Sequence, residues 1–364
     1  MVSAKGHEVH VLQPPSMRAS DTGFMEQESE AGSSVMLHDV RMNRGILKYR
    51  VPLDRMIKKG WYCVNANRAV KRLAEVKGID AVLFYNMALY PVTNLQRAVS
   101  IYDLGDDHIE LLRHEMGKLE NRLILSLARL ILRKTLQKAD VVFSASHYLK
   151  EKYSPNSVVL PNGVSMEAVK HGSGAALRQR YPGPIVGFVG SLEYFIPFEQ
   201  ILEADERMRE CTFVIAGGGR EYDWLLKEKL GRNLANVVLT GGLPHAEILR
   251  YIDSFDICLN LFRKNPLTDG ACPIKLFEYM AHKKAIISSR VREVEKIDQG
   301  FLYWADNTDE VVRSIRDILV NQELARVKGE KAFRVVVENY TWQKIADRFL
   351  ETIEQSRLSG NADR

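Results

Sequence analysis

The stretch that decides the fold reads PIKLFEYMA and spans residues 273–281. Its first residue, a proline, suits the first turn of a helix, where no amide hydrogen is needed. Leu276, Phe277 and Met280 then recur at helical spacing, and a β-type run from Lys284 to Ser289 follows. The stretch therefore predicts a helix that leads into a strand of an α/β domain.

Two charged side chains make this predicted helix a candidate binding element. Lys275 and Glu278 are three positions apart, so both project from one side of its first turns. The free amides and dipole of a helix N-terminus favour anions, and Lys275 adds a full positive charge. Glu278 could accept hydrogen bonds from sugar hydroxyls, so the pair suits the phosphate and ribose of a nucleotide. On these residues alone, a buried helix with an incidental ion pair is the simpler interpretation.

The composition indicates a soluble globular protein with two domains. Its 364 residues are too many for one ordinary core. The net charge of +5, from 51 basic and 46 acidic residues, is too balanced to suggest nucleic acid as a partner. The four cysteines show no CxxC spacing, which argues against structural zinc and disulfides and fits a reducing cytoplasm. Neither a membrane-spanning run of about 18 apolar residues nor a signal peptide is expected, so we predict a cytoplasmic protein.

Strands alternate with helices twice along the chain. The first set of expected strands covers residues 81–85, 98–102, 141–144 and 158–160, with one long helix over 110–139. After a glycine-bearing linker at 165–183, the second set covers residues 185–189, 212–216, 237–239, 257–260 and 285–289. This pattern predicts two doubly wound parallel-sheet domains, with ligands collecting in a cleft at the carboxyl ends of their strands. The expected boundaries are 1–164 and 165–339, followed by a C-terminal helix over 340–364.

The beginning of the chain departs from this pattern. Residues 5–12 predict a helix end, a glycine turn and a strand, whereas an α/β domain normally opens one strand and one helix earlier. Either a first βα unit is missing or it lies upstream. Residues 13–40 predict a long loop, and residues 41–80 are strongly basic around Trp61 and Tyr62. Such a basic segment suits an anionic membrane surface, or equally a solvated helical face.

Seven short segments, taken in order and spacing, carry a family resemblance that each alone would not. They are KGHEVHVL (5–12), YD (102–103) with DD (106–107), PNGV (161–164), GFVGSL (187–192), GGG (217–219), NVVLTG (236–241) leading to a proline, and PIKLFEYMA (273–281). In these segments the chain resembles the GT-B glycosyltransferases, in particular the family-4-related enzymes (glycosyl transferases group 1) of exopolysaccharide and cell-envelope glycan synthesis. The resemblance covers nearly the whole chain after the missing first unit. It also implies that the C-terminal helix over 340–364 crosses back to the first domain.

This resemblance implies that the second domain binds a nucleotide-sugar donor. Gly190 and Ser191 would let the backbone approach the diphosphate, and Lys275 would neutralise it as the leaving group forms. Glu278 would hold the ribose, and the backbone at 243–244 would meet the base. No metal or other cofactor is expected, because the helix end and the lysine serve where other transferases use a metal. The candidate donor-binding residues are Gly190, Ser191, Gly217, Gly218, Leu243, Pro244, Asp269, Gly270, Ile274, Lys275 and Glu278.

The chain departs from the family pattern at two places in this domain. The first glutamate of the usual Glu-x7-Glu falls at Gly270, so either the adjacent Asp269 substitutes for it or the sugar contact is lost. The basic residue that often follows the first glycine of the donor loop is also absent. The phosphate charge would then rest on Lys275, with Arg263 or Lys264 as candidates to help. For Gly217–Gly219, simple tight turns are an equal alternative to a donor loop.

An acidic cluster follows the strand at 98–102 in the first domain. Asp103, Asp106 and His108 are the candidate catalytic residues, and resembling inverting enzymes use an aspartate at the position of Asp106 to deprotonate the acceptor hydroxyl. The alternative is that Asp103 or Asp107 merely caps the following helix. A metal site is disfavoured because no partner cluster occurs elsewhere in the sequence.

The sequence thus predicts a cytoplasmic glycosyltransferase that moves a sugar from a nucleotide-diphosphate donor to a hydroxyl acceptor. The basic segment 41–80 suggests a glycan or lipid-linked saccharide acceptor at the inner face of a membrane. A nucleotide-sugar epimerase or hydrolase of the same fold is one alternative, and a non-catalytic nucleotide-sugar-binding protein is another. A nicotinamide dehydrogenase is disfavoured, because no GxGxxG follows a strand with an acidic residue about 20 positions on.

Overall fold

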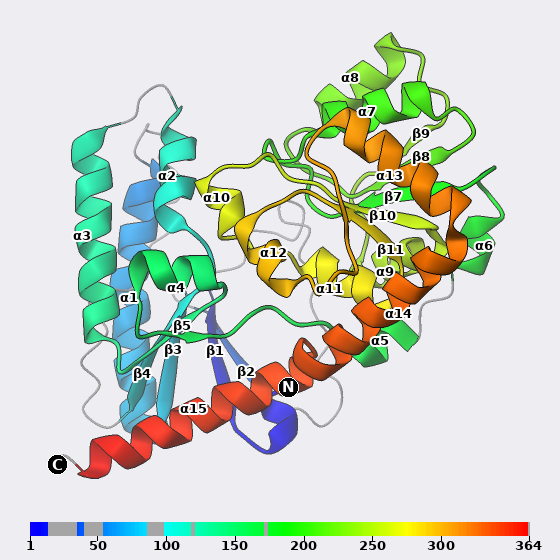
Figure 1. The fold of residues 1–364 in the computed structure, drawn as a ribbon. Coiled ribbons are helices and arrows are strands. Elements are labelled where there is room, and N and C mark those ends of the chain that lie inside the picture. Colours follow the sequence, from blue (N-terminus) through cyan, green and yellow to red (C-terminus); the bar gives the residue numbers. More distant parts are fainter. Residues whose placement is uncertain (14–34, 40–53, 86–97, 118–120, 171–173, 363–364) are drawn as a thin grey trace. The chain divides into compact units, whose positions relative to one another are not determined.

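The computed structural model describes residues 1–13, 35–39, 54–85, 98–117, 121–170 and 174–362, which form two α/β units (Figure 1). The first unit comprises Met1–Leu160 with Ala346–Arg364, and the second comprises Pro161–Ile345. The sequence placed the domain boundaries after residues 164 and 339, whereas the structure places them after residues 160 and 345. The PNGV segment (161–164) and the first residues of the C-terminal helix therefore belong to the second unit. No helix in the described ranges is long and apolar enough to cross a membrane.

The first unit contains only parallel strand pairs among its described residues. A four-stranded sheet has the order β3-β4-β5-β6, and a separate pair joins β1 to β2 with Val9 opposite Val35. Its elements are the 3-10 helix η1 (Ser3–Lys5), β1 (Val9–Gln13), β2 (Val35–Asp39), α1 (Asp54–Lys77), β3 (Ala81–Tyr85), β4 (Val99–Leu104), α2 (His108–Met116), α3 (Arg122–Lys138), β5 (Val141–Ser144), α4 (His147–Tyr153) and β6 (Val158–Val159).

The second unit contains a six-stranded parallel sheet of order β12-β11-β10-β7-β8-β9. Its elements are α5 (Met166–Lys170), α6 (Ala175–Arg178), β7 (Ile185–Val189), α7 (Phe198–Arg207), β8 (Thr212–Ala216), α8 (Tyr222–Gly231), β9 (Val237–Leu239), α9 (His245–Ser254), β10 (Ile257–Asn260), α10 (Pro266–Asp269), α11 (Ile274–Ala281), β11 (Ala285–Ser288), α12 (Arg292–Ile297), β12 (Tyr303–Trp304), α13 (Thr308–Val320), α14 (Gln322–Asn339) and α15 (Trp342–Ala362).

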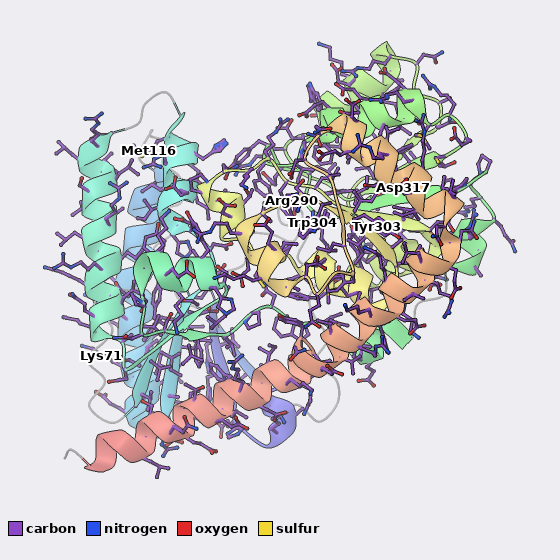
Figure 2. All side chains as sticks on the ribbon, viewed as in Figure 1. Lys71, Met116, Arg290, Tyr303, Trp304 and Asp317 are labelled. Carbon is purple, nitrogen blue, oxygen red and sulfur yellow. The ribbon has the colours of Figure 1, made fainter. Side chains whose placement is uncertain are left out.

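The central strands of this second sheet are apolar along their whole length. Every residue of β7, β8, β10 and β11 is buried, as expected of parallel strands with both faces covered. The sheet ends at the short strand β12, where the guanidinium of Arg290 lies 5.1 Å from the Trp304 ring (Figure 2). The core of the unit therefore lies at its central strands.

The final helix, α15, begins in the second unit and continues into the first. Its residues Phe349 and Ile353 pack against Ile101, Val141 and Phe143, which come from β4 and β5. The ring centroids of Phe143 and Phe349 are 5.2 Å apart. The structure thus places this part of the C-terminal helix on the first unit's sheet.

Three local predictions were wrong. The long helix expected over 110–139 is two helices, because Gly117 caps α2 with a φ of 52° and the Asn121 side chain caps α3. The expected loop over 13–40 contains the strand β2, although residues 14–34 lie outside the described part. The expected linker over 165–183 contains the short helices α5 and α6.

Candidate functional site

The strand order of the second unit marks where a ligand would bind. The chain proceeds outward from β7 through β8 to β9, and in the opposite direction from β10 through β11 to β12. In open α/β sheets, ligands bind at the carboxyl ends of the strands where this order reverses. The residues that follow the two strands at the reversal are Gly190 after β7 and Leu261 and Phe262 after β10.

The ammonium group of Lys275 lies at this reversal point. Its Nζ is 4.0 Å from the ring centroid of Phe188, in β7, and 5.2 Å from that of Phe262. A Cβ atom on Gly190 would lie 3.6 Å from the same Nζ, so the ammonium is in van der Waals range of this glycine. Burial lowers the pKa of Lys275 to about 7, and the nearby Glu278 acts in the opposite direction. A bound anion beside Lys275 would favour the charged form of the lysine.

Helix α11, which carries Lys275, is fixed to both strands at the reversal. The buried Tyr279 hydroxyl accepts a hydrogen bond from Val189 N at 3.0 Å and is 3.4 Å from Leu259 O. The loop before α11 is held by the PNGV segment, since Asn162 Nδ2 donates to Cys272 O at 2.7 Å. Sequence reasoning named PNGV only as a family marker and missed this role. These contacts hold the amides at the N-terminus of α11 in one position.

The glycines after β7 and β8 are required by close backbone packing. Gly190 has a φ of +124° and Gly217 a φ of +153°, conformations that disfavour other residues. A Cβ atom on Gly217 would lie 1.9 Å from Gly190 O, and one on Gly219 would lie 2.4 Å from Leu192 O. Gly190 N also donates to the carbonyl of Ala216 at 3.0 Å. The Gly217–Gly219 segment therefore packs directly against the segment that begins at Gly190.

The carboxylate of Glu278 has a partner that sequence reasoning missed. Its Oε1 lies 2.7 Å from Nε2 of His245, the residue directly after Pro244. Glu278 is buried, whereas the imidazole of His245 is exposed, and the hydrogen bond raises the pKa of His245. The pair brings the segment at Leu243 and Pro244 beside α11. The sequence did contain a signal for this partner. His245 directly follows the candidate base-binding segment and is the first residue of helix α9.

Three further predicted residues are engaged elsewhere. The Asp269 carboxylate accepts a hydrogen bond from Arg292 N at 3.2 Å, at the start of α12, and the buried Gly270 ends helix α10. Arg263 binds Glu199 at 2.6 Å and donates to Tyr194 O at 3.0 Å, so it holds the segment after β7. By contrast, Ser191 is exposed and Ile274 presents 44% of its surface at the start of α11.

The acidic cluster of the first unit lies at the carboxyl end of β4. Asp106 is exposed and accepts a hydrogen bond from the Tyr85 hydroxyl at 3.1 Å, and the Tyr85 and His108 rings meet edge to face. Burial and the charge of Asp106 raise the pKa of Asp103 to about 6. Burial, followed by the same Asp106, raises the pKa of Tyr85 to about 12. The three predicted catalytic residues therefore lie together with Tyr85, a tyrosine that sequence reasoning missed.

Asp107 has a structural role, as the helix-capping alternative proposed. Its buried carboxylate caps α2 through Glu110 N at 3.0 Å and accepts hydrogen bonds from Lys152 Nζ at 2.7 Å and the Tyr153 hydroxyl at 2.6 Å. These bonds join α2 to α4. Within the described ranges, no group of three or more histidine, cysteine, aspartate and glutamate side chains is arranged to hold a metal.

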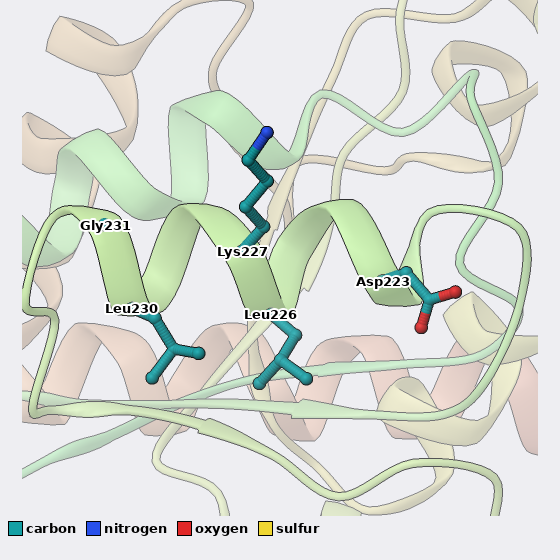
Figure 3. Close-up of a pocket in the computed structure, with 5 residues that line it drawn as sticks. All are labelled: Asp223, Leu226, Lys227, Leu230 and Gly231. Atoms are coloured by element: carbon teal, nitrogen blue, oxygen red, sulfur yellow. The ribbon is translucent and has the colours of Figure 1, made fainter.

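A hollow on the outside of the second unit contains none of these residues. It runs along α8 and is lined by Asp223, Leu226, Lys227, Leu230 and Gly231 (Figure 3). One helix supplies the whole lining, so the hollow is a surface groove rather than an enclosed site.

Two α/β units with parallel sheets are the architecture of the GT-B fold, and comparison with known proteins agrees. Residues 197–351 match the family model described as "Glycosyl transferase-like". The sucrose-phosphate synthase of Thermosynechococcus elongatus superposes with a TM-score of 0.76 at 16% identity, covering 97% of this chain and 90% of that chain. Anabaena HepE in complex with UDP-glucose superposes with a TM-score of 0.65 at 13% identity, covering 89% and 86%. These likenesses confirm the predicted fold class.

Curated relatives confirm the resemblance to the group 1 glycosyltransferases. The teichuronic acid biosynthesis glycosyltransferase TuaH of Bacillus subtilis is 25% identical over 47% of this chain and 45% of its own length. The O-antigen chain mannosyltransferase C of Escherichia coli is 26% identical over 57% of each chain. The chain thus spans about half the length of these curated relatives, both of which are named for cell-envelope glycans.

Proposed function

We propose that this protein is a glycosyltransferase that uses a nucleotide-diphosphate sugar. The observation that carries the proposal is the Lys275 ammonium at the strand reversal, next to the fixed N-terminus of α11. A lysine and free helix amides form an anion site of the kind that binds a diphosphate. The relatives and the HepE complex with UDP-glucose support the same ligand class.

In the proposed reaction, the bond between the anomeric carbon and the diphosphate oxygen breaks as an acceptor hydroxyl attacks that carbon. Lys275 and the α11 amides stabilise the charge on the leaving diphosphate, which is the task a metal performs in other transferases. Asp106 takes the proton of the acceptor hydroxyl, with Asp103 and His108 beside it. The Glu278–His245 pair binds the ribose, and the backbone at Leu243 and Pro244 meets the base.

The proposed acceptor is a glycan or a lipid-linked saccharide in envelope polysaccharide synthesis, reached from the cytoplasmic face of a membrane. The names of TuaH and the O-antigen mannosyltransferase support this acceptor class. The basic segment 41–80 remains our sequence-based hypothesis for membrane contact, and side chains up to Cys63 lie outside the described part.

One observation supports a second candidate function, which is nucleotide-sugar binding without catalysis. The family glutamate is Gly270 here, and the adjacent Asp269 is bound to Arg292 N, which suits a protein that binds a nucleotide sugar without transferring it. Product formation from a donor panel with a lipid-linked or glycan acceptor separates the two functions. Product formed without any acceptor would indicate the epimerase or hydrolase instead.

Calorimetry with nucleoside diphosphates tests the donor site directly. Lys275→Ala should weaken the affinity about 10–100-fold, because a charged hydrogen-bonding partner of the diphosphate is lost. Lys227→Ala, an exposed lysine on α8, is the matched control and should bind as the parent does. A Lys275→Ala protein that is folded and binds with unchanged affinity would overturn the proposal.

A further inference from the structure

Helix α3 presents an unusual outer face. Leu125, Ala128, Leu132 and Thr135 are buried against the first unit. On its other side, Leu123, Leu127 and Leu130 follow each other at i, i+4 and i+7 and are therefore neighbours on one face. Their exposed fractions are 80%, 57% and 46%, so a stripe of leucine faces solvent along the first half of the helix.

The charges on α3 all have the same sign. The helix carries five basic residues and no acidic one, and its first residue is Arg122. Arg122, Arg129 and Arg133 are spaced by seven and four positions, so they form a strip beside the leucines. Lys134 continues the leucine stripe toward the C-terminus. Among the described residues, neither Arg129, Arg133 nor Lys134 forms an ion pair with a carboxylate.

We propose that α3 is a membrane-docking helix that lies in the surface of an anionic bilayer. Its leucine stripe would enter the boundary between head groups and acyl chains, and the arginines beside it would contact the lipid phosphates. A helix that combines a leucine face with arginine and lysine and lacks acidic residues has the composition of an interfacial helix. The same charge pattern is what attracts a segment to an anionic leaflet.

The observations favour a lipid surface over a second copy of the chain. A symmetric pairing through the leucine stripe would bring the arginine strips of two copies together, and like charges at close range oppose association. An anionic surface offers apolar depth and complementary charge to the same residues. The proposal concerns a surface distinct from the basic segment 41–80 and does not depend on the transfer reaction.

Helix α8 supplies a matched comparison within the same protein. Leu226 and Leu230 are exposed at i and i+4, with exposed fractions of 39% and 70% (Figure 3). However, α8 mixes Asp223 and Glu228 with Lys227 and Lys229, so its face has no excess of positive charge. We therefore expect α3, and not α8, to bind anionic lipid.

Vesicle flotation tests the proposal with the full chain. The vesicles contain phosphatidylcholine alone or phosphatidylcholine with phosphatidylglycerol, at low and high salt. The parent should bind the anionic vesicles and be released by salt. Arg129→Gln with Arg133→Gln should weaken binding by about tenfold or more, since each charge near an anionic surface contributes about fivefold. Leu127→Gln with Leu130→Gln should weaken it similarly, whereas Leu226→Gln with Leu230→Gln should bind like the parent.

A second measurement places the helix at the membrane. In a Leu127→Trp variant, anionic vesicles should shift the added tryptophan emission to shorter wavelength, and lipids brominated on the acyl chain should quench it. Circular dichroism and the unfolding midpoint confirm that each variant is folded. Equal binding by the α3 variants and the parent would overturn the proposal, as would equal losses in the α8 variant or equal binding to neutral vesicles. Release of a leucine-mediated dimer in the absence of lipid would assign the stripe to self-association instead.

Discussion

The two units place opposite charges at the carboxyl ends of their strands. In the second unit, Lys275 lies between β7 and β10 beside a helix N-terminus, and its pKa is lowered to about 7 by burial. In the first unit, Asp103 lies near the end of β4 and Asp106 follows that strand, and the pKa of Asp103 is raised to about 6 by burial and the charge of Asp106. Both shifts move a charged group toward its neutral form near neutral pH.

The two sites differ in the ligand that would stabilise each shifted group. A buried lysine gains from an arriving anion, whereas a carboxylate crowded by a second carboxylate gains from an arriving proton. One site is therefore suited to hold a diphosphate and the other to take a proton from a hydroxyl. The two proposed tasks would thus be performed on similar sheets by different residues at the strand ends. The predictions below separate the two tasks.

The largest expected effect concerns the acidic site. Asp106→Asn should lower the transfer rate by about 10²–10⁴-fold while leaving the affinity for the nucleotide sugar unchanged, because a general base acts on the acceptor proton. Steady-state kinetics with calorimetry of donor binding measures both quantities. Asp107→Asn is the contrasting variant, since that residue caps α2 and binds Tyr153, and it should lower the unfolding midpoint. A normal rate in Asp106→Asn would remove this aspartate from the mechanism.

The next effect concerns the pH dependence of donor affinity. Free Lys275 has a pKa of about 7, and a bound diphosphate would raise it, so binding takes up a proton above neutral pH. The affinity for a nucleotide sugar should be full below pH 7 and fall by about tenfold per pH unit above it, or about 100-fold by pH 9. Calorimetry in buffers of different ionisation enthalpy also measures the proton uptake. Lys275→Arg stays charged, so a pH dependence that persists in this variant would contradict the assignment.

The sequence predicted most of the fold because the strands of the second unit carry a strong signal. Fully buried parallel strands such as β7 and β8 read as continuous apolar runs, and the glycines after them mark the turns. The errors fell where one residue decides the local structure. Gly117 ends α2 by adopting a positive φ, and the sequence pattern across 110–139 was apolar and helical on both sides of it.

The sequence named the charged residues of the candidate site but not the side chains around them. Lys275 became a candidate through its place at a helix start together with the family resemblance, because the helix alone was explained equally well by an incidental ion pair. The two rings beside Lys275 are far apart in sequence, since Phe188 lies in β7 and Phe262 follows β10, and the sheet order brings them together. His245 and Tyr85 were missed for the same reason, since each acts through a carboxylate that is distant along the chain.

A smaller effect concerns the stability cost of the cationic site. The pKa of Lys275 is lower in the folded chain than in the unfolded chain, so between about pH 7 and pH 10.5 the unfolded state binds more protons and stability rises with pH. Below pH 7 the folded chain bears the full cost of a buried charge. Lys275→Met should therefore raise the free energy of unfolding by roughly 1–3 kcal/mol at pH 6, and by less at pH 9. Denaturant unfolding at both pH values measures this, and an equal or opposite change would show that the ammonium is not strained.

The smallest effect concerns the Glu278–His245 pair. His245 is exposed and binds Glu278 at 2.7 Å, so it orients that carboxylate without lying in the core. His245→Ala should weaken nucleotide-sugar binding by about 3–10-fold, the cost of one charged hydrogen bond, with stability near that of the parent. Because the bond raises the pKa of His245, its contribution is present when the imidazole is charged and is lost as pH rises through the folded pKa. The affinity difference between parent and variant should therefore shrink above neutral pH. An affinity difference that grows with pH would contradict this role for the charged histidine. It would mean that Glu278 binds the ribose best when it is not hydrogen-bonded to a charged His245.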